Sequence, residues 1–310
     1  YRLSDFPASR VSTWNGHFRD DLRRFWKGEK NSTWPLKDRL LGSPSLYKDT
    51  EGSVQKSVNF ITSHDGFTLA DLVSFNKKHN LSNGESNRDG ENHNNSWNHG
   101  IEGPSTKKEL CSIRSRQQRN LLSTLLLSPG IPMILMGDEI GRSQGGNNNT
   151  WCQNNALGWM LWDEDNCDNE LKEFVKKLIK IRTNLLELFS PESTPISQSF
   201  FTKNTERFWI QWHGVKASKP DWGSWSHTIS YSINESDLGS IIWLGLNAYD
   251  QPMSFELPNP ISSWIKLIDT ASLSTNDLKA QKITNQKEIK IESRSLILLA
   301  TKKYSKINNL

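Results

Sequence analysis

Apolar residues in the first 190 positions follow two patterns. Helical spacing marks four amphipathic helices, and short apolar runs between them mark buried strands. Strands that alternate with helices along a chain are typical of a parallel sheet with helices outside it, which is an α/β arrangement. The predicted helices run from Gly16 to about Lys27, from Thr68 to about Lys78, from a cap at Thr106 to Pro129, and over about 171–186; the predicted strands are 11–14, 58–62 and 131–136, the last two fully buried.

Beyond Pro191 apolar residues alternate with polar ones, which is the period of a strand with one face in the core. Short strands in succession favour an all-β, antiparallel β-sandwich. We therefore place a domain boundary near Ser190, with residues 1–190 on one side and 191–310 on the other. The predicted strands are 208–212, 225–233, 240–248, 253–257, 264–268, 288–291 and 295–300.

Two features of the first part leave its architecture open. Residues 79–104 contain seven Asn between Asn80 and Asn98 and show no periodicity, and a loop of this length is usually functional or disordered. Three parallel strands also cannot close a barrel that takes about eight. The first part is therefore either a small open sheet or the last part of a larger unit.

Composition and charge exclude several classes of protein. The 38 Lys+Arg against 34 Asp+Glu give a net charge of +4, which demands no nucleic-acid or other polyanionic partner. No apolar run approaches the ~18 residues of a membrane span, so no membrane partner is expected. Three cysteines without metal-ligand spacing favour a reducing compartment, and we expect a cytoplasmic protein.

Tryptophan is the one unusual component, with 13 Trp against 5 Tyr. Most of these side chains are expected in the core. The remainder suit a carbohydrate site, because a flat apolar ring stacks well on the C–H face of a sugar.

Acidic residues follow two successive predicted strands. His64-Asp65 comes after 58–62, and Asp138-Glu139 comes after 131–136. Parallel sheets place active sites at the C-terminal ends of their strands, so both clusters are expected to face one pocket. Two carboxylates about 5–5.5 Å apart would serve a retaining glycosidase as nucleophile and acid/base. The alternatives are that His64-Asp65 only ends a strand, and that Asp138 and Glu139 bind neighbouring backbone amides.

Other polar patterns predict neither a metal nor a cofactor. The segment from Glu85 begins like a calcium loop, but Ser96 stands at position 12 where the bidentate carboxylate belongs, so no EF-hand is supported. The loop histidines His79, His93 and His99 have no ligand spacing. A basic stretch is interpreted as a solvated helix face, with nucleic-acid contact as the alternative. It comprises Lys107, Lys108, Arg114, Arg116 and Arg119.

Several long strings point to a family. NFITSHDGFTL, from Asn59, resembles the fourth conserved region of the α-amylase clan, glycoside hydrolase family 13, in its debranching branch. WNGHFRDDLRRFWKG from Trp14, NGESNRDGENHNNSWNHG from Asn83 and GDEIGRSQGGNNNTWCQNN from Gly137 are similar to bacterial glycogen debranching and isoamylase-type enzymes. The resemblance is close over roughly residues 1–190 and looser beyond. It implies the C-terminal part of a (β/α)8 TIM barrel followed by an antiparallel β-sandwich domain.

The resemblance also implies an activity, namely hydrolysis of α-1,6 branch linkages in glycogen or amylopectin with retention. Asp65 resembles the acidic residue that holds the sugar's 2- and 3-hydroxyls and stabilises the oxocarbenium-like transition state. His64 resembles the histidine that hydrogen-bonds the same ring, and Asp138 lies in a region near the substrate cleft. No cofactor is expected.

One departure from the family is important. Its nucleophile is an Asp in a G-x-R-x-D string and its acid/base is a Glu at the next strand end, and neither string occurs here. The chain by itself is therefore expected to be inactive, because such groups act as a unit. Its expected partners are a branched α-glucan and a missing N-terminal half of the barrel. The alternative from another class is a non-catalytic glucan-binding protein.

Overall fold

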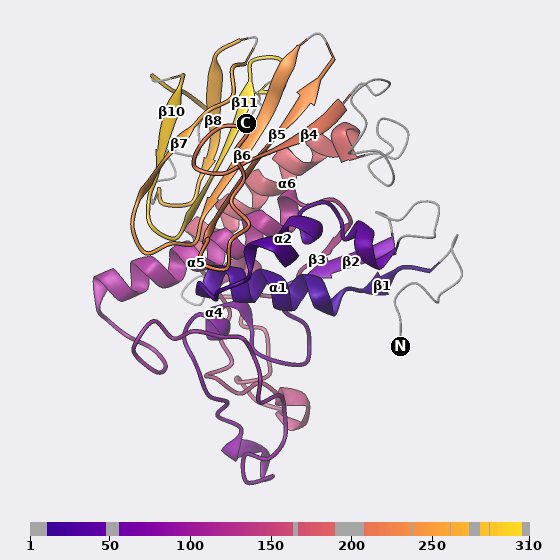
Figure 1. The fold of residues 1–310 in the computed structure, drawn as a ribbon. Coiled ribbons are helices and arrows are strands. Elements are labelled where there is room, and N and C mark those ends of the chain that lie inside the picture. The colour runs from indigo at the N-terminus through magenta and orange to yellow at the C-terminus, as the bar shows by residue number, and fades with distance from the viewer. Residues whose placement is uncertain are drawn as a thin grey trace.

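The computed structural model of the chain describes residues 11–47, 56–163, 167–189, 208–236, 238–260, 262–272, 280–284 and 286–305. A small parallel sheet lies beside the first helices, and a large antiparallel sheet lies above the two longest helices, α5 and α6 (Figure 1). Two polar loops, residues 79–104 and 142–155, extend together on the side away from the large sheet (Figure 1).

The small sheet has three parallel strands in the order β1-β2-β3. They are β1 (Thr13–Trp14), β2 (Ser57–Phe60) and β3 (Ile131–Met133). Val58 pairs with Trp14 on one side and with Ile131 on the other. Within the described ranges, neither β1 nor β3 has a partner strand on its outer edge. The prediction that 131–136 is fully buried is wrong, because β3 is an edge strand and Ile131 is 43% exposed.

The helix predicted from Gly16 is confirmed as α1 (Gly16–Lys27). Asn15 begins it by accepting a hydrogen bond from Phe18 N at 2.9 Å, and Gly28 ends it at a φ of 83° that L-residues disfavour. The other helices of the described chain are α2 (Thr33–Arg39), α4 (Leu69–Leu72), α5 (Lys108–Leu127) and α6 (Asn169–Phe189), with single 3₁₀ turns at η2 (Pro44–Leu46), η3 (Leu81–Asn83), η4 (Asp138–Ile140) and η5 (Thr150–Cys152).

Two helix predictions need correction. Thr68 caps α4 as expected, but α4 ends at Leu72 and does not run to Lys78. The carbonyl oxygens of Leu72 and Ser74 accept hydrogen bonds from backbone amides of the 79–104 loop, at 3.1 and 2.9 Å, so the helical ladder stops there. The second correction is the start of α5, which has Lys107 in place of Thr106 as its N-cap.

The large sheet is antiparallel, with six strands in the order β4-β5-β6-β11-β8-β9. A separate pair, β10-β7, covers one face of it, and Trp243, Phe255 and Trp264 are buried between the two. The predicted strands all occur, and the short β9 was not predicted. The bounds are β4 (Phe208–His213), β5 (Thr228–Glu235), β6 (Gly239–Asn247), β7 (Met253–Glu256), β8 (Trp264–Asp269), β9 (Gln281–Lys282), β10 (Glu288–Ile291) and β11 (Ser295–Thr301).

The other face of the large sheet packs on the helices of the first part. Leu122 of α5, Leu178 of α6 and Leu244 of β6 belong to one continuous cluster of buried side chains. Both faces of the central strands are therefore covered, which is why polar positions such as Ser230 of β5 are also buried. The predicted boundary at Ser190 lies outside the described residues, so the division into two domains stays a prediction.

The basic stretch is a solvated face only at its start, where Lys107 and Lys108 are exposed, and that interpretation is wrong for Arg114 and Arg119. Arg114 and Arg119 are each only 6% exposed. Arg114 donates to the carbonyl oxygen of Gly103 at 2.6 Å, and Arg119 donates to that of Thr270 at 3.0 Å. These guanidinium groups tie α5 to the polar loop and to the large sheet, because buried carbonyl oxygens need donors.

Two further observations concern the chain as a whole. No helix in the described ranges is both long enough and apolar enough to cross a bilayer. The three cysteines, Cys111, Cys152 and Cys167, are all free thiols.

Candidate active site

Three segments of the chain lie side by side at the C-terminal ends of the parallel strands of the small sheet. Trp14 ends β1, His64-Asp65 follows β2, and Asp138-Glu139 follows β3. The rings of Trp14 and His64 meet edge to face with centroids 6.0 Å apart. The two acidic segments therefore follow adjacent parallel strands as expected, and the prediction that both face one pocket stays a prediction. Trp14, which is 45% exposed, lies beside His64, and the sequence analysis did not single it out as a candidate. Its place at a strand end was the available signal.

His64 and Asp65 form an exposed pair at this edge. His64 Nε2 lies 3.2 Å from Asp65 Oδ2, and the two side chains are 71% and 78% exposed. The turn that carries them is fixed at its backbone, because Gly66 N donates to the carbonyl oxygen of Asn148 at 3.0 Å. Gly66 has a φ of 106°, which favours glycine. The turn therefore exposes a carboxylate and an imidazole to solvent while its backbone is held by the 142–155 loop.

Asp138 has the opposite environment, because it is 2% exposed. The hydroxyl of Thr62 and the backbone amide of Leu69 both donate to its carboxylate, the amide at 2.9 Å. Burial raises the pKa of Asp138 to about 7, although both hydrogen bonds act to lower it. Thr62 and Leu69 flank the turn that carries His64 and Asp65. Asp138 therefore holds the two ends of that turn together.

Glu139 also contacts its own backbone, since its Oε2 accepts a hydrogen bond from Gly137 N at 2.8 Å. The geometry favours the capping alternative for Asp138 and Glu139 over direct contact with a substrate. The two acidic clusters do lie at adjacent strand ends, but only the first of them is exposed. Among the described residues, no group of three or more His, Cys, Asp or Glu side chains is arranged to hold a metal ion.

The two asparagine-rich loops hold each other in place next to this edge. Asn80 Nδ2 donates to Asn148 Oδ1 at 2.8 Å, and Asn148 N donates back to Asn80 Oδ1 at 2.9 Å. The buried carboxylate of Asp71, on α4, accepts hydrogen bonds from Ser143 and from the amide of Gln144. A carboxamide both donates and accepts, so it can satisfy the backbone of a loop that has no secondary structure. The abundance of Asn is thus explained by loop architecture.

Lys78 occupies the position that a bound cation would take in the 79–104 loop. Its residue is 9% exposed, and its Nζ donates to the carbonyl oxygens of Arg88, Asp89 and Gly90, at 3.1, 2.7 and 3.3 Å. Carbonyl oxygens converging on one point also form calcium loops. Here the ammonium group of the chain itself is their partner.

We expect Lys78→Met to loosen this loop while the rest of the fold remains. The substitution keeps the apolar stem and leaves three converging carbonyl oxygens without their donor, which costs about 1.5–3 kcal/mol. Hydrogen exchange should become faster for amides of the 79–104 loop and stay unchanged in the large sheet. Lys77→Met, at the exposed neighbouring position, is the matched control. Equal exchange in both variants would contradict the role of Lys78.

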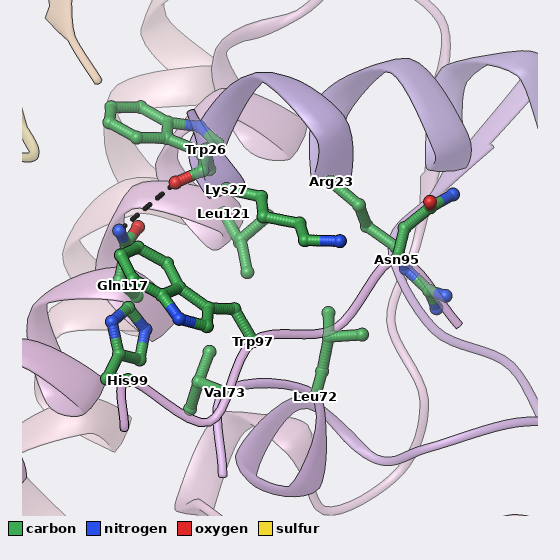
Figure 2. A pocket seen from close by; sticks show the side chains of 10 residues that line it. All are labelled: Arg23, Trp26, Lys27, Leu72, Val73, Asn95, Trp97, His99, Gln117 and Leu121. Atoms are coloured by element: carbon green, nitrogen blue, oxygen red, sulfur yellow. Dashed lines mark hydrogen bonds between the residues drawn. The ribbon is translucent and has the colours of Figure 1, made fainter. Parts of the chain in front are cut away.

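A small pocket lies between α1, α4, α5 and the loop around Trp97, and Figure 2 shows its lining. Trp97 and His99 lie side by side there, with ring centroids 4.1 Å apart. A dashed line marks the hydrogen bond that Gln117 Nε2 donates to the carbonyl oxygen of Trp26 at 3.3 Å (Figure 2). Its volume of about 20 Å³ accommodates roughly a water molecule and excludes a sugar ring.

Comparisons with known proteins agree with the strings singled out above. The family described as Isoamylase 1-3, C-terminal, matches residues 211–307. Isoamylase 1, chloroplastic, of Oryza sativa subsp. japonica is 38% identical over 279 residues, which are 89% of this chain and 33% of that protein. Glycogen debranching enzyme of Dickeya chrysanthemi is 40% identical over 262 residues, which are 83% of this chain and 37% of that protein.

Among solved structures, the apo pullulanase from Paenibacillus barengoltzii aligns with a TM-score of 0.61 at 17% identity, over 94% of this chain and 38% of that one. At this identity the alignment shows a shared fold.

Three parallel strands with helices, followed by a large antiparallel sheet, define the class of the fold as an α/β unit joined to a β-sheet. Within that class, the sequence similarities establish that the chain belongs to the debranching, isoamylase-type branch of glycoside hydrolase family 13. The chain spans between a third and two fifths of the length of the curated relatives reported above.

Proposed function

We propose that the chain forms part of a retaining glycosidase that hydrolyses α-1,6 branch linkages in glycogen or amylopectin. The observation that carries this proposal is the exposed His64-Asp65 pair beside Trp14, at the C-terminal edge of a parallel sheet. A carboxylate there accepts hydrogen bonds from sugar hydroxyls. The indole of Trp14 offers an apolar face on which a sugar ring stacks.

The roles proposed for Asp65, His64 and Asp138 follow from the exposure of their side chains. Asp65 binds adjacent hydroxyls of the sugar and, as an anion, stabilises the positive charge that develops at the oxocarbenium-like transition state. His64 donates a hydrogen bond to the same ring and is oriented by Asp65, 3.2 Å away. Asp138 does not contact the sugar in this proposal. It positions the turn that carries the other two residues.

The small sheet is proposed to be a sector of a (β/α)8 barrel. Both of its edge strands have unpaired outer edges within the described chain, and Met136 beyond β3 is 57% exposed. Unpaired edges and exposed apolar side chains favour a partner that adds parallel strands. We propose that this partner also supplies the nucleophile and the acid/base. A cytoplasmic location stays a prediction.

A complementation assay tests this function. We expect the chain alone to release no reducing ends from glycogen, because the nucleophile and acid/base strings are absent from it. Co-expression with the N-terminal part of the Dickeya chrysanthemi glycogen debranching enzyme should restore release from glycogen, whereas unbranched amylose should give none. Hydrolysis by the chain alone would overturn the assignment of roles. Failure of the complemented sample, with both parts folded and associated, would overturn the proposed activity.

A non-catalytic glucan-binding protein is the second candidate. It is favoured by exposed tryptophans outside the strand ends, among them Trp151, which is 81% exposed, and Trp162, which is 75% exposed. The same assay separates the two functions, since a binding protein releases no reducing ends from glycogen even when the complementing part is present.

A further inference from the structure

One group of tryptophans combines two exposed rings with one half-buried ring. Trp34 is on α2, and Trp222 and Trp225 are in the segment between β4 and β5; we call these three residues the aromatic surface. Trp34 is 60% exposed and Trp225 is 70% exposed. The two segments are joined by a hydrogen bond from Asn31 N to the carbonyl oxygen of Ser224, at 3.0 Å. Residues almost 200 positions apart therefore form one surface.

The rings of the aromatic surface are held in defined orientations. Trp34 and Trp222 meet edge to face, with centroids 5.8 Å apart, and Trp222 in turn meets the half-buried Trp212 at 5.5 Å. Trp225 Nε1 donates to Asp221 Oδ2 at 3.2 Å. The ring of Trp225 also lies against Gly223, where an added Cβ would come within 2.5 Å of it. The exposed rings are thus fixed before any ligand arrives, which lowers the entropic cost of binding.

The charges next to the aromatic surface are already engaged within the chain. Lys37 Nζ lies 4.6 Å from the ring centroid of Trp34 and 5.1 Å from that of Trp222, as a cation–π contact. Asp221 accepts from Trp225 and, at 2.9 Å, from Gly223 N. A neutral ligand with apolar ring faces therefore fits this surface better than a charged one.

We propose that the aromatic surface is a second α-glucan binding site, which takes a run of neutral glucose units by stacking on Trp34 and Trp225. The choice of ligand rests on the proposed function. Binding of the polymer at two places on the same chain would raise the effective concentration of branch points at the His64-Asp65 edge. Neither the hydrolytic groups nor the partner that completes the sheet takes part in this binding.

The test uses the 310-residue chain and two measurements, co-sedimentation with glycogen and calorimetric titration with maltoheptaose. Trp34→Ala combined with Trp225→Ala should weaken glycogen binding by about tenfold or more, because both stacking faces are removed. Trp34→Phe combined with Trp225→Phe should retain part of the affinity, since a flat ring remains at each position. Ile179→Ala, at a 47% exposed apolar position on α6, is the matched control and should bind as the wild type does.

The proposal is overturned if the double alanine variant, with an unchanged melting temperature, binds glycogen as tightly as the wild type. It is also overturned if the wild-type chain binds no glycogen, or if single-stranded DNA displaces the glucan from these tryptophans, which would indicate a nucleic-acid surface. A different result is expected if only the proposed function is wrong. Complementation then gives no hydrolysis, but the double alanine variant still binds glycogen more weakly than the wild type. Asp65→Asn should leave binding at the aromatic surface intact.

Discussion

Asp65→Asn in the complemented protein is expected to lower the rate of release of linear chains from glycogen by about 10³-fold or more. Asparagine keeps the shape of the side chain and one acceptor oxygen, but it removes the negative charge that faces the developing oxocarbenium ion. The Asp65 side chain is 78% exposed and contacts only His64 among the ion pairs of the turn, so the fold should not change. The initial rate of reducing-end release tests the expected loss of activity. The melting temperature, measured on the same sample, tests whether the fold is unchanged.

Glu85→Gln is the control for the Asp65 substitution. It neutralises an exposed carboxylate in the 79–104 loop that the proposal assigns no role. Its rate should match that of the wild type. An Asp65→Asn protein that is folded and fully active would refute the role proposed for this carboxylate, while leaving the family membership untouched.

Asp138→Ala is expected to lower the free energy of unfolding by about 3 kcal/mol. The side chain is buried, and its removal leaves the Thr62 hydroxyl and the Leu69 amide without an acceptor in a site closed to solvent. The turn between them carries His64 and Asp65, so activity of the complemented protein should fall as well. Urea unfolding of the chain alone measures the stability. An unchanged midpoint and slope would show that Asp138 does not hold this turn.

Asp138→Asn separates charge from shape through the pH dependence of stability. The folded pKa of Asp138 is raised to about 7 from an ordinary 3.8, mainly by burial. Between these pH values the folded protein keeps a proton that the unfolded chain releases. Protonated Asp138 therefore contributes to the free energy of unfolding at low pH. This contribution is lost as the pH rises through about 7, by up to about 1.4 kcal/mol per pH unit.

The asparagine variant has no proton to lose at this position, so its stability should depend less on pH between about 4 and 7. The difference in the free energy of unfolding between the wild type and Asp138→Asn should therefore shrink as the pH rises. Parallel pH curves for the two proteins would contradict the raised pKa of Asp138.

Local signals in the sequence predicted a large share of the fold. The start of α1 follows from the side chain of Asn15, and its end follows from Gly28. Strand β5 of the large sheet follows from its period of two, and β6 and β11 follow from short apolar runs. The polar residues after β2 and β3 could also be placed, because parallel strands necessarily end at the same edge. The strings around Trp14, His64 and Gly137 identified the family without a structure.

The errors have a common origin. Sequence spacing did not reveal that α4 stops at Leu72, because the amides that donate to the carbonyl oxygens of Leu72 and Ser74 belong to a loop more than 20 residues away. It also did not reveal that Arg114 and Arg119 are buried. Their acceptors are the carbonyl oxygens of distant loops, and a basic helix face looks the same in sequence whether it meets water or protein.

The sequence by itself determined the periodic elements, the family, and the positions of Asp65 and Asp138 after two successive strands. Only the tertiary structure decided that Asp65 faces solvent while Asp138 is buried. The partners of Asp138 lie 76 and 69 residues away, at Thr62 and Leu69. The aromatic surface likewise joins α2 to a segment far along the chain. Backbone periodicity is set by neighbours in sequence, whereas exposure and hydrogen-bond partners are set by neighbours in space.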